Sequence, residues 1–131
     1  STLEDILEAL GTNLSEFFHE EEEEQIVFTQ KDFFVDTQEE YQIEWIVPNA
    51  QKNEMEPILL TLHPKGKSHE LSAHHGEEFG YVLKGEIVIT LGSDKYRAKA
   101  GESFYYTPDK KHYISSKKGA EILWVSAPPS F

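Results

Sequence analysis

Two histidines and one glutamate occupy positions from which they could act together. His74 and Glu78 lie four residues apart at the start of an apolar run, and His112 follows the turn that Pro108 marks. The chain contains no Cys, which excludes a disulfide scaffold, a thiolate zinc site and a cysteine nucleophile.

Alternating apolar and polar residues predict that short β-strands carry these side chains. Runs rich in β-branched and aromatic residues recur from residue 25 onward, separated by Gly, Pro, Asn and Asp. The predicted strands cover residues 25–29, 41–47, 57–62, 79–83, 86–91, 95–98, 103–107, 112–115 and 121–126. Because no helix-length periodic segment interrupts them, the sequence predicts a sandwich or small barrel rather than a parallel α/β sheet.

The first 24 residues differ from the rest in pattern and in charge. Leu3, Ile6, Leu7 and Leu10 follow the spacing of one helix face. Nine acidic and no basic residues fall in this segment, which therefore carries most of the net charge of −12. Because the remainder of the chain is nearly balanced in charge, and a surface that tracks phosphates needs clustered Lys and Arg, we expect a poor nucleic-acid binder. No apolar run approaches the roughly 18 residues that a membrane span needs.

Two segments resemble the sequence motifs of the cupin superfamily. In the first motif a Glu is followed, after six intervening residues, by a Gly, as Glu78 and Gly85 are here. The second motif is matched by Gly101, Pro108 and His112. The resemblance implies a mainly β, cupin-type barrel (a double-stranded β-helix or jelly roll), here with a short N-terminal helical segment.

The cupin resemblance also implies a metal site, which this chain matches only in part. His74, Glu78 and His112 occupy ligand positions, but Ser72 replaces the first histidine of the motif. Serine is a poor replacement for imidazole, and nearby His69 would face away from position 72 in an extended chain. Two histidines and a carboxylate still form an open facial triad for Zn, Fe, Ni or Mn. The alternative is a metal-free cavity in which the three side chains form hydrogen bonds.

Both ends of the chain resemble one group of bacterial regulators. Residues 2–18, TLEDILEALGTNLSEFF, are similar to the last helix and exit turn of repressor-type helix-turn-helix domains. Residues 76–91 and 120–131 resemble the C-terminal cupin sensor domain of regulators such as the putrescine-utilisation repressor group. The resemblance implies a truncated helix-turn-helix domain at residues 1–18, an acidic linker at 19–24 and a cupin sensor domain at 25–131. It also implies a cytoplasmic homodimer that binds DNA through residues preceding Ser1.

The same group implies a polyamine effector, putrescine or spermidine. A di- or trication needs carboxylates and aromatic walls, because ring faces attract ammonium groups. The predicted ligand-binding residues are His74, Glu78, His112, Tyr106, Tyr113 and Trp45. Ordinary core packing of the aromatic residues is the structural alternative. The functional alternatives are a small metal-dependent cupin enzyme, either an isomerase or a dioxygenase, and a metal-free storage or scaffold protein.

Overall fold

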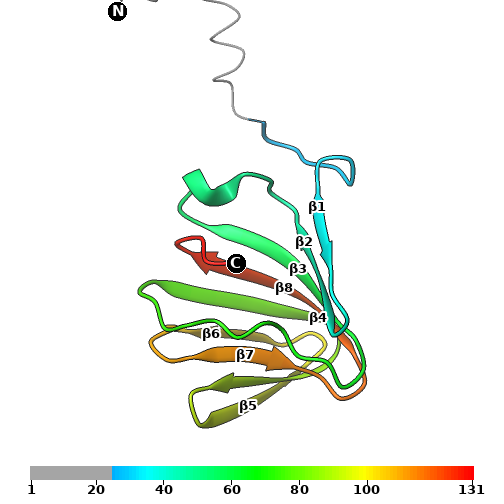
Figure 1. The fold of residues 1–131 in the computed structure, drawn as a ribbon, viewed down its shortest axis with the longest axis vertical. Coiled ribbons are helices and arrows are strands. Elements are labelled where there is room, and N and C mark those ends of the chain that lie inside the picture. Colours follow the sequence, from blue (N-terminus) through cyan, green and yellow to red (C-terminus); the bar gives the residue numbers. More distant parts are fainter. Residues whose placement is uncertain (1–24) are drawn as a thin grey trace, which may run out of the picture.

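The computed structural model describes residues 25–131, so the predicted helical segment at 1–18 and the acidic linker at 19–24 lie outside the described residues. The described elements are β1 (Phe34–Thr37), β2 (Tyr41–Trp45), the short 3-10 helix η1 (Ala50–Lys52), β3 (Glu56–Leu62), β4 (Glu77–Leu91), β5 (Asp94–Lys99), β6 (Ser103–Tyr106), β7 (His112–Ser115) and β8 (Ala120–Ala127). Figure 1 shows β1, β2, β3, β8 and β4 side by side. No helix within residues 25–131 is long and apolar enough to cross a membrane.

Strand β4 joins the two halves of an antiparallel barrel. Its residues 77–85 pair with β8 and β6, whereas residues 86–91 pair with β5 and β7. Gly85 lies where the pairing changes and has a φ of 81°, a left-handed conformation that favours glycine. A Cβ at this position would lie 2.4 Å from the Gly119 carbonyl oxygen. The glycine of the first motif is therefore required by the bend in β4.

The core lies inside the barrel and follows directly from strand alternation. Buried and half-buried residues alternate along all seven residues of β3 and all eight of β8. The inward-facing apolar side chains form one cluster that includes Ile43, Ile58, Leu60, Leu62, Val82, Ile87, Ile89, Ile114, Ile122 and Trp124. This arrangement confirms the mainly β, cupin-type barrel that the motifs predicted.

The first predicted strand is wrong, and the first observed strand was not predicted. Residues 25–29 form no strand, and Ile26 is 80% exposed. The Asp32 carboxylate instead accepts hydrogen bonds from the Thr29 amide and the Gln25 side chain, which holds a local turn. An apolar run becomes a strand only beside another strand, and it is β1 that pairs with the free edge of β2.

Gly80 leaves room inside the barrel for an aromatic side chain. Gly80 on β4 lies directly opposite Phe104 on β6. A Cβ on Gly80 would lie 2.0 Å from Phe104 Cζ. The Phe104 ring in turn stacks on Tyr106, with ring centroids 6.0 Å apart and an interplanar angle of 12°. The missing side chain at position 80 therefore sets the position of the aromatic pair.

We predict that Gly80→Ala lowers the free energy of unfolding by about 1–3 kcal/mol, because the added methyl group overpacks the barrel against Phe104. Urea denaturation measures the change. In a Phe104→Ala background the same substitution should cost much less, since the clashing ring is gone. An equal cost in both backgrounds would show that Phe104 is not the constraint.

Candidate functional site

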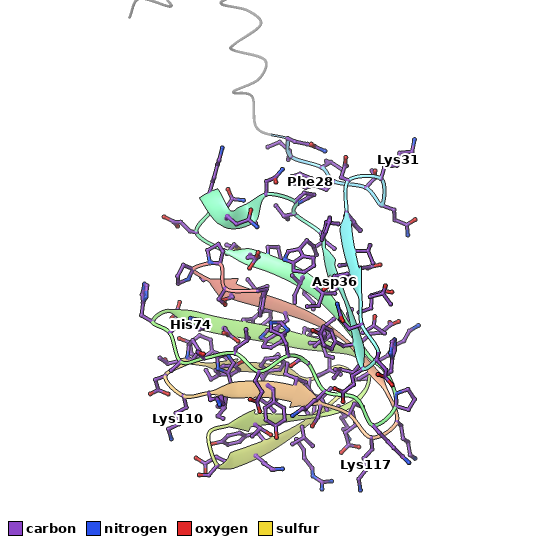
Figure 2. All side chains as sticks on the ribbon, in the orientation of Figure 1. Phe28, Lys31, Asp36, His74, Lys110 and Lys117 are labelled. Atoms are coloured by element: carbon purple, nitrogen blue, oxygen red, sulfur yellow. The ribbon has the colours of Figure 1, made fainter. Side chains whose placement is uncertain are left out.

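Four polar side chains meet inside the barrel around Glu78. Glu78 faces inward between exposed Glu77 and Phe79, and is 1% exposed. Tyr106 lies directly opposite it on β6, and His112 is the first residue of β7. His74 precedes β4 in a loop, which Figure 2 places near the start of that strand.

The Glu78 carboxylate is the centre of this cluster. Its Oε1 accepts a hydrogen bond of 2.5 Å from the Tyr106 hydroxyl. Its Oε2 lies 2.8 Å from His74 Nε2 and 2.9 Å from His112 Nε2. One potential ligand atom from each of His74, Glu78 and His112 lies within 4.8 Å of the other two. The structure therefore brings together four of the six predicted ligand-binding residues.

Backbone carbonyl groups determine which imidazole nitrogen carries a proton. His74 Nδ1 lies 2.9 Å from the His75 carbonyl oxygen, and His112 Nδ1 lies 2.7 Å from that of Lys110. Because a carbonyl oxygen only accepts, Nδ1 is the protonated nitrogen in both rings. In a neutral ring Nε2 then carries a lone pair, whereas in an imidazolium ring it donates to Glu78. The cluster can thus be an internal ion pair or a set of convergent acceptors for a cation.

The pKa values favour the ion-paired state when no ligand is bound. Burial alone raises the pKa of Glu78, but hydrogen bonds from His112 and Tyr106 outweigh it and hold the pKa below its ordinary value. Burial lowers the pKa of His112, but the Glu78 carboxylate and the Lys110 carbonyl together raise it above its ordinary value. Burial and the Glu78 charge raise the pKa of Tyr106, which therefore remains a donor.

Tyr113, and the motif position held by Ser72, face away from the cluster, whereas Trp45 lies on a more distant strand. Tyr113 faces the opposite side of β7 from His112, because strand alternation turns successive side chains to opposite faces. Its ring lies beneath Lys67, with Nζ 4.9 Å from the centroid. Trp45 faces the same side of β2 as buried Ile43, where it packs on Phe34 and against the hydrophobic core, with β3 and β8 between its strand and β4. Ser72 is exposed.

His69 was passed over in the sequence and lies on the inner side of the barrel. Its ring packs 5.8 Å from that of Tyr41, and its Nδ1 is buried without a hydrogen-bond partner among the described residues. Burial lowers the pKa of His69, while the charges of Asp36 and Glu78 act in the opposite direction. Alternation could not find it, because residues 67–75 make only isolated bridges at Lys67 and Leu71 rather than a continuous strand.

The side chain of Trp124 adds a buried donor near the cluster. Its indole N–H is close enough to the Tyr106 hydroxyl to oppose the rise in the Tyr106 pKa. It nevertheless makes no hydrogen bond within the described part of the chain. A buried donor without a partner is costly, so the site offers one donor as well as its acceptors.

A second buried carboxylate, Glu56, is already occupied. Its Oε1 accepts hydrogen bonds from the backbone amides of Ser130, at 3.1 Å, and Phe131, at 2.8 Å. The Phe131 ring packs on Trp124 with centroids 4.6 Å apart. Glu56 therefore fixes residues 128–131 against the barrel and is not available to a ligand.

We predict that the stability of the metal-free domain is greatest between about pH 4.5 and 6.5, the ordinary pKa values of Glu and His. The raised His112 pKa stabilises the fold fully below 6.5, and this contribution is lost as pH rises through the folded value. The lowered Glu78 pKa stabilises the fold above 4.5, and that contribution is lost as pH falls through the folded value.

Urea denaturation across this range measures the effect in wild type and in His112→Gln. The variant should lose the decrease in stability on the alkaline side, whereas His75→Gln, which removes an exposed histidine, should retain it. Parallel curves for wild type and His112→Gln would exclude an ion pair between His112 and Glu78.

Comparisons with known proteins identify the same fold. Residues 58–126 match the Cupin_2 family, described as "Cupin domain". The HTH-type transcriptional regulator PuuR of Escherichia coli (strain K12) is 32% identical over 130 residues, which are 97% of this chain and 70% of PuuR.

Solved structures share the fold at lower identity. An HTH_3 family transcriptional regulator from Vibrio cholerae superposes with a TM-score of 0.61 at 20% identity, over 69% of this chain and 52% of that regulator. This chain thus spans about half the length of that protein. Hydroxypropylphosphonic acid epoxidase from S. wedmorenis gives 0.65 at 19% identity, over 78% of this chain and 59% of the enzyme. The family profile and the similarity to PuuR together show that the chain belongs to the Cupin_2 family and is related to the HTH-type transcriptional regulator PuuR.

Proposed function

We propose that this barrel senses a small cationic effector, a polyamine such as putrescine or spermidine, and thereby modulates DNA binding by a helix-turn-helix domain. The observation that carries the proposal is the convergence of His74 Nε2, His112 Nε2 and a Glu78 carboxylate oxygen. A primary ammonium group has three N–H donors, which these three acceptors match. The carboxylate also supplies the opposite charge.

Aromatic rings beside the acceptors favour an organic cation. Tyr106 packs edge-on against His112, with ring centroids 5.5 Å apart, and stacks on Phe104 on its other side. Ring faces attract ammonium groups and also cover the methylene chain of a polyamine. Tyr113 is no longer part of this proposal, because it faces the opposite side of β7 from His112, whereas Trp45 remains a candidate wall on the side of β1 and β2.

A second carboxylate can receive the other end of a diamine. Asp36 on β1 lies opposite buried Ile43 on β2, so it faces the inner side of the sheet. Burial lowers the pKa of His69, and the charges of both Asp36 and Glu78 oppose this lowering, which supports a place for His69 between the two carboxylates. A ligand with two ammonium groups would be held at two ends, and a monoamine at one.

The partner in solution is proposed to be a second copy of this chain. Outward-facing apolar side chains cover the sheet formed by β3, β8, β4 and β6, including Leu59, Leu123, Phe79, Tyr81, Leu83 and Tyr105. Tyr105 is 61% exposed and Phe79 is 41% exposed. Exposed apolar faces of this kind mark interfaces, and regulators that read two DNA half-sites are two-fold dimers.

Charges at the edge of this face are self-complementary. Lys84 pairs with Glu121 at 3.7 Å on one side of the face, and Glu77 accepts a hydrogen bond from Tyr105 on the other. A two-fold axis through the face would bring the Lys84 of one copy toward acidic residues of the other. An interface of standard size needs about 800 Å² from each partner, which a four-stranded face can supply.

A metal-dependent cupin enzyme is the alternative function. His74, Glu78 and His112 present the two imidazoles and one carboxylate of a facial triad, and Nδ1–H bonds to carbonyl groups orient both rings as in many metal sites. A divalent metal would act as a Lewis acid with open positions for a substrate. Against this alternative stand Ser72, in place of the first histidine of the motif, and the relationship to a regulator.

We predict that putrescine raises the thermal midpoint of chelator-treated protein by about 3 °C or more at saturation, because it binds the native state only. Glu78→Gln should abolish the shift, whereas Glu77→Gln, the exposed neighbour, should retain it. Asp36→Asn should weaken the response to putrescine but leave that to butylamine, a monoamine, unchanged.

No shift with any polyamine would exclude polyamine sensing. A stoichiometric transition metal in protein purified without chelator, lost in His112→Ala, would instead favour the enzyme.

We predict further that the chain is a dimer by light scattering and that Tyr81→Glu makes it a monomer, because the added charge would be buried between the two copies. The variant Tyr96→Glu, at an exposed tyrosine on β5, serves as the matched control and should remain dimeric. Dimeric Tyr81→Glu would place the interface elsewhere.

A further inference from the structure

Half of the basic residues of this acidic chain converge on one groove. Lys and Arg number twelve in the whole sequence, and six of them line a cavity of about 880 Å³. These six are Lys65, Lys95, Arg97, Lys99, Lys117 and Lys118, and Glu86 is the one acidic residue of the lining. Positive charge is therefore concentrated on this face, although the chain as a whole is acidic.

The groove is built from parts that are distant in sequence. Lys95, Arg97 and Lys99 alternate along β5 and so share one face, where Arg97 lies opposite Val88 on β4. The loop at Lys65 and the β7–β8 turn at Lys117 supply the rest of the lining. Positive charges from three separate segments thus face a single concave space.

Backbone hydrogen bonds hold this frame in place. The Lys65 amide donates to the Lys117 carbonyl at 2.9 Å, and the Ser116 amide donates to the Gly66 carbonyl at 3.1 Å. Ser116 Oγ also donates to the Glu86 carbonyl at 2.7 Å. The cationic side chains therefore extend from a fixed backbone, which reduces the ordering cost when they bind a ligand.

Lys65 itself adopts a conformation that a glycine would adopt at lower cost. Its φ is 65°, in the left-handed region, and only one other non-glycine among the described residues, Asn49, has a positive φ. The left-handed backbone at this position favours glycine, which has no side chain. The sequence nevertheless has a lysine here, and so places a charged side chain beside the groove. Strain of this kind is concentrated at functional sites.

Most of the charge in the groove is not neutralised within the described residues. Arg97 lies 3.8 Å from Glu86, and both side chains are largely exposed, so this pair is weak. The five lysines of the groove form no ion pair with any residue of the described range 25–131. Five like charges brought together without partners repel one another, and an anion relieves that repulsion.

We propose that this groove binds a phosphorylated small molecule that carries at least two negative charges. Its volume lies in the range of about 300–1,000 Å³ typical of small-molecule sites. Lysine and arginine are the residues that bind phosphate oxygens. The groove is a second site, because Figure 2 places Lys117 and His74 at opposite sides of the domain.

A DNA backbone is a less suitable occupant. The described chain begins at Gln25 beside β1, whereas β5 lies at the opposite end of the domain in Figure 1. A DNA-reading domain attached before Gln25 would therefore join the end of the barrel away from the groove. A concave site of this volume is also better suited to enclose a small ligand than to contact the extended backbone of a DNA duplex.

Isothermal titration with tripolyphosphate at low salt tests the proposal on the full chain. Wild type should bind it, and the affinity should fall as salt is added, because salt screens exposed charges. The double variant Lys99→Gln/Lys117→Gln should bind about tenfold more weakly, and the matched control Lys31→Gln/Lys52→Gln, which removes two lysines outside the groove, should bind as wild type does.

Three results would overturn the proposal: no binding of tripolyphosphate at millimolar concentration, equal weakening in the two double variants, or tighter binding of a random-sequence DNA duplex than of tripolyphosphate. The putrescine shift should be the same in Lys99→Gln/Lys117→Gln as in wild type. Failure of the anion site and failure of polyamine sensing are therefore distinguished by separate measurements.

Discussion

The burial of one carboxylate group constrains the rest of this site. Removing a charge from water costs several kcal/mol unless partners replace the lost hydration. Glu78 is 1% exposed and has its partners in Tyr106 on β6, His112 on β7 and His74 in the loop before β4. The carboxylate therefore requires that β6, β7 and this loop come together around β4. The same requirement leaves a cluster of acceptors at the centre of the barrel, which a cation can use once the histidines are neutral.

Much of this arrangement was predictable because it depends on local patterns. Alternation identified most of the strands, although the two strands predicted at 79–83 and 86–91 form the single strand β4, in which Glu78 faces inward. The pairing of His74 and His112 with Glu78 followed from the cupin resemblance, since that fold brings its two motifs together. Alternation places Tyr106 on the same strand face as Phe104 and away from Tyr105, and the structure turns that face inward.

Features that depend on the path of loops, or on several segments at once, were not predictable. Tyr113 was placed beside His112 in the site, but adjacent strand residues face opposite sides, and the facing of β7 is set only by its pairing with β4. His69 lies in a segment without regular strand pairing, so alternation along the sequence does not predict which way its side chain points. The basic groove is formed by β5 and two loops that are far apart in sequence. Counting charges along the chain does not show that these segments meet in space.

Strand β4 links the proposed effector site to the proposed dimer face. Glu78 and Gly80 face the barrel interior, while Phe79 and Tyr81, on alternate residues of the same strand, face outward. A cation that donates to the Glu78 carboxylate replaces the hydrogen bonds between Glu78 and the two histidines, His74 and His112. Any resulting movement of β4 also moves the side chains on its outward face. An effector changes dimer geometry only if it binds one arrangement more tightly than the other, because equal affinity shifts no population. Since β4 is hydrogen-bonded to four other strands, it cannot move alone, and the difference between the two arrangements must be shared by both halves of the barrel.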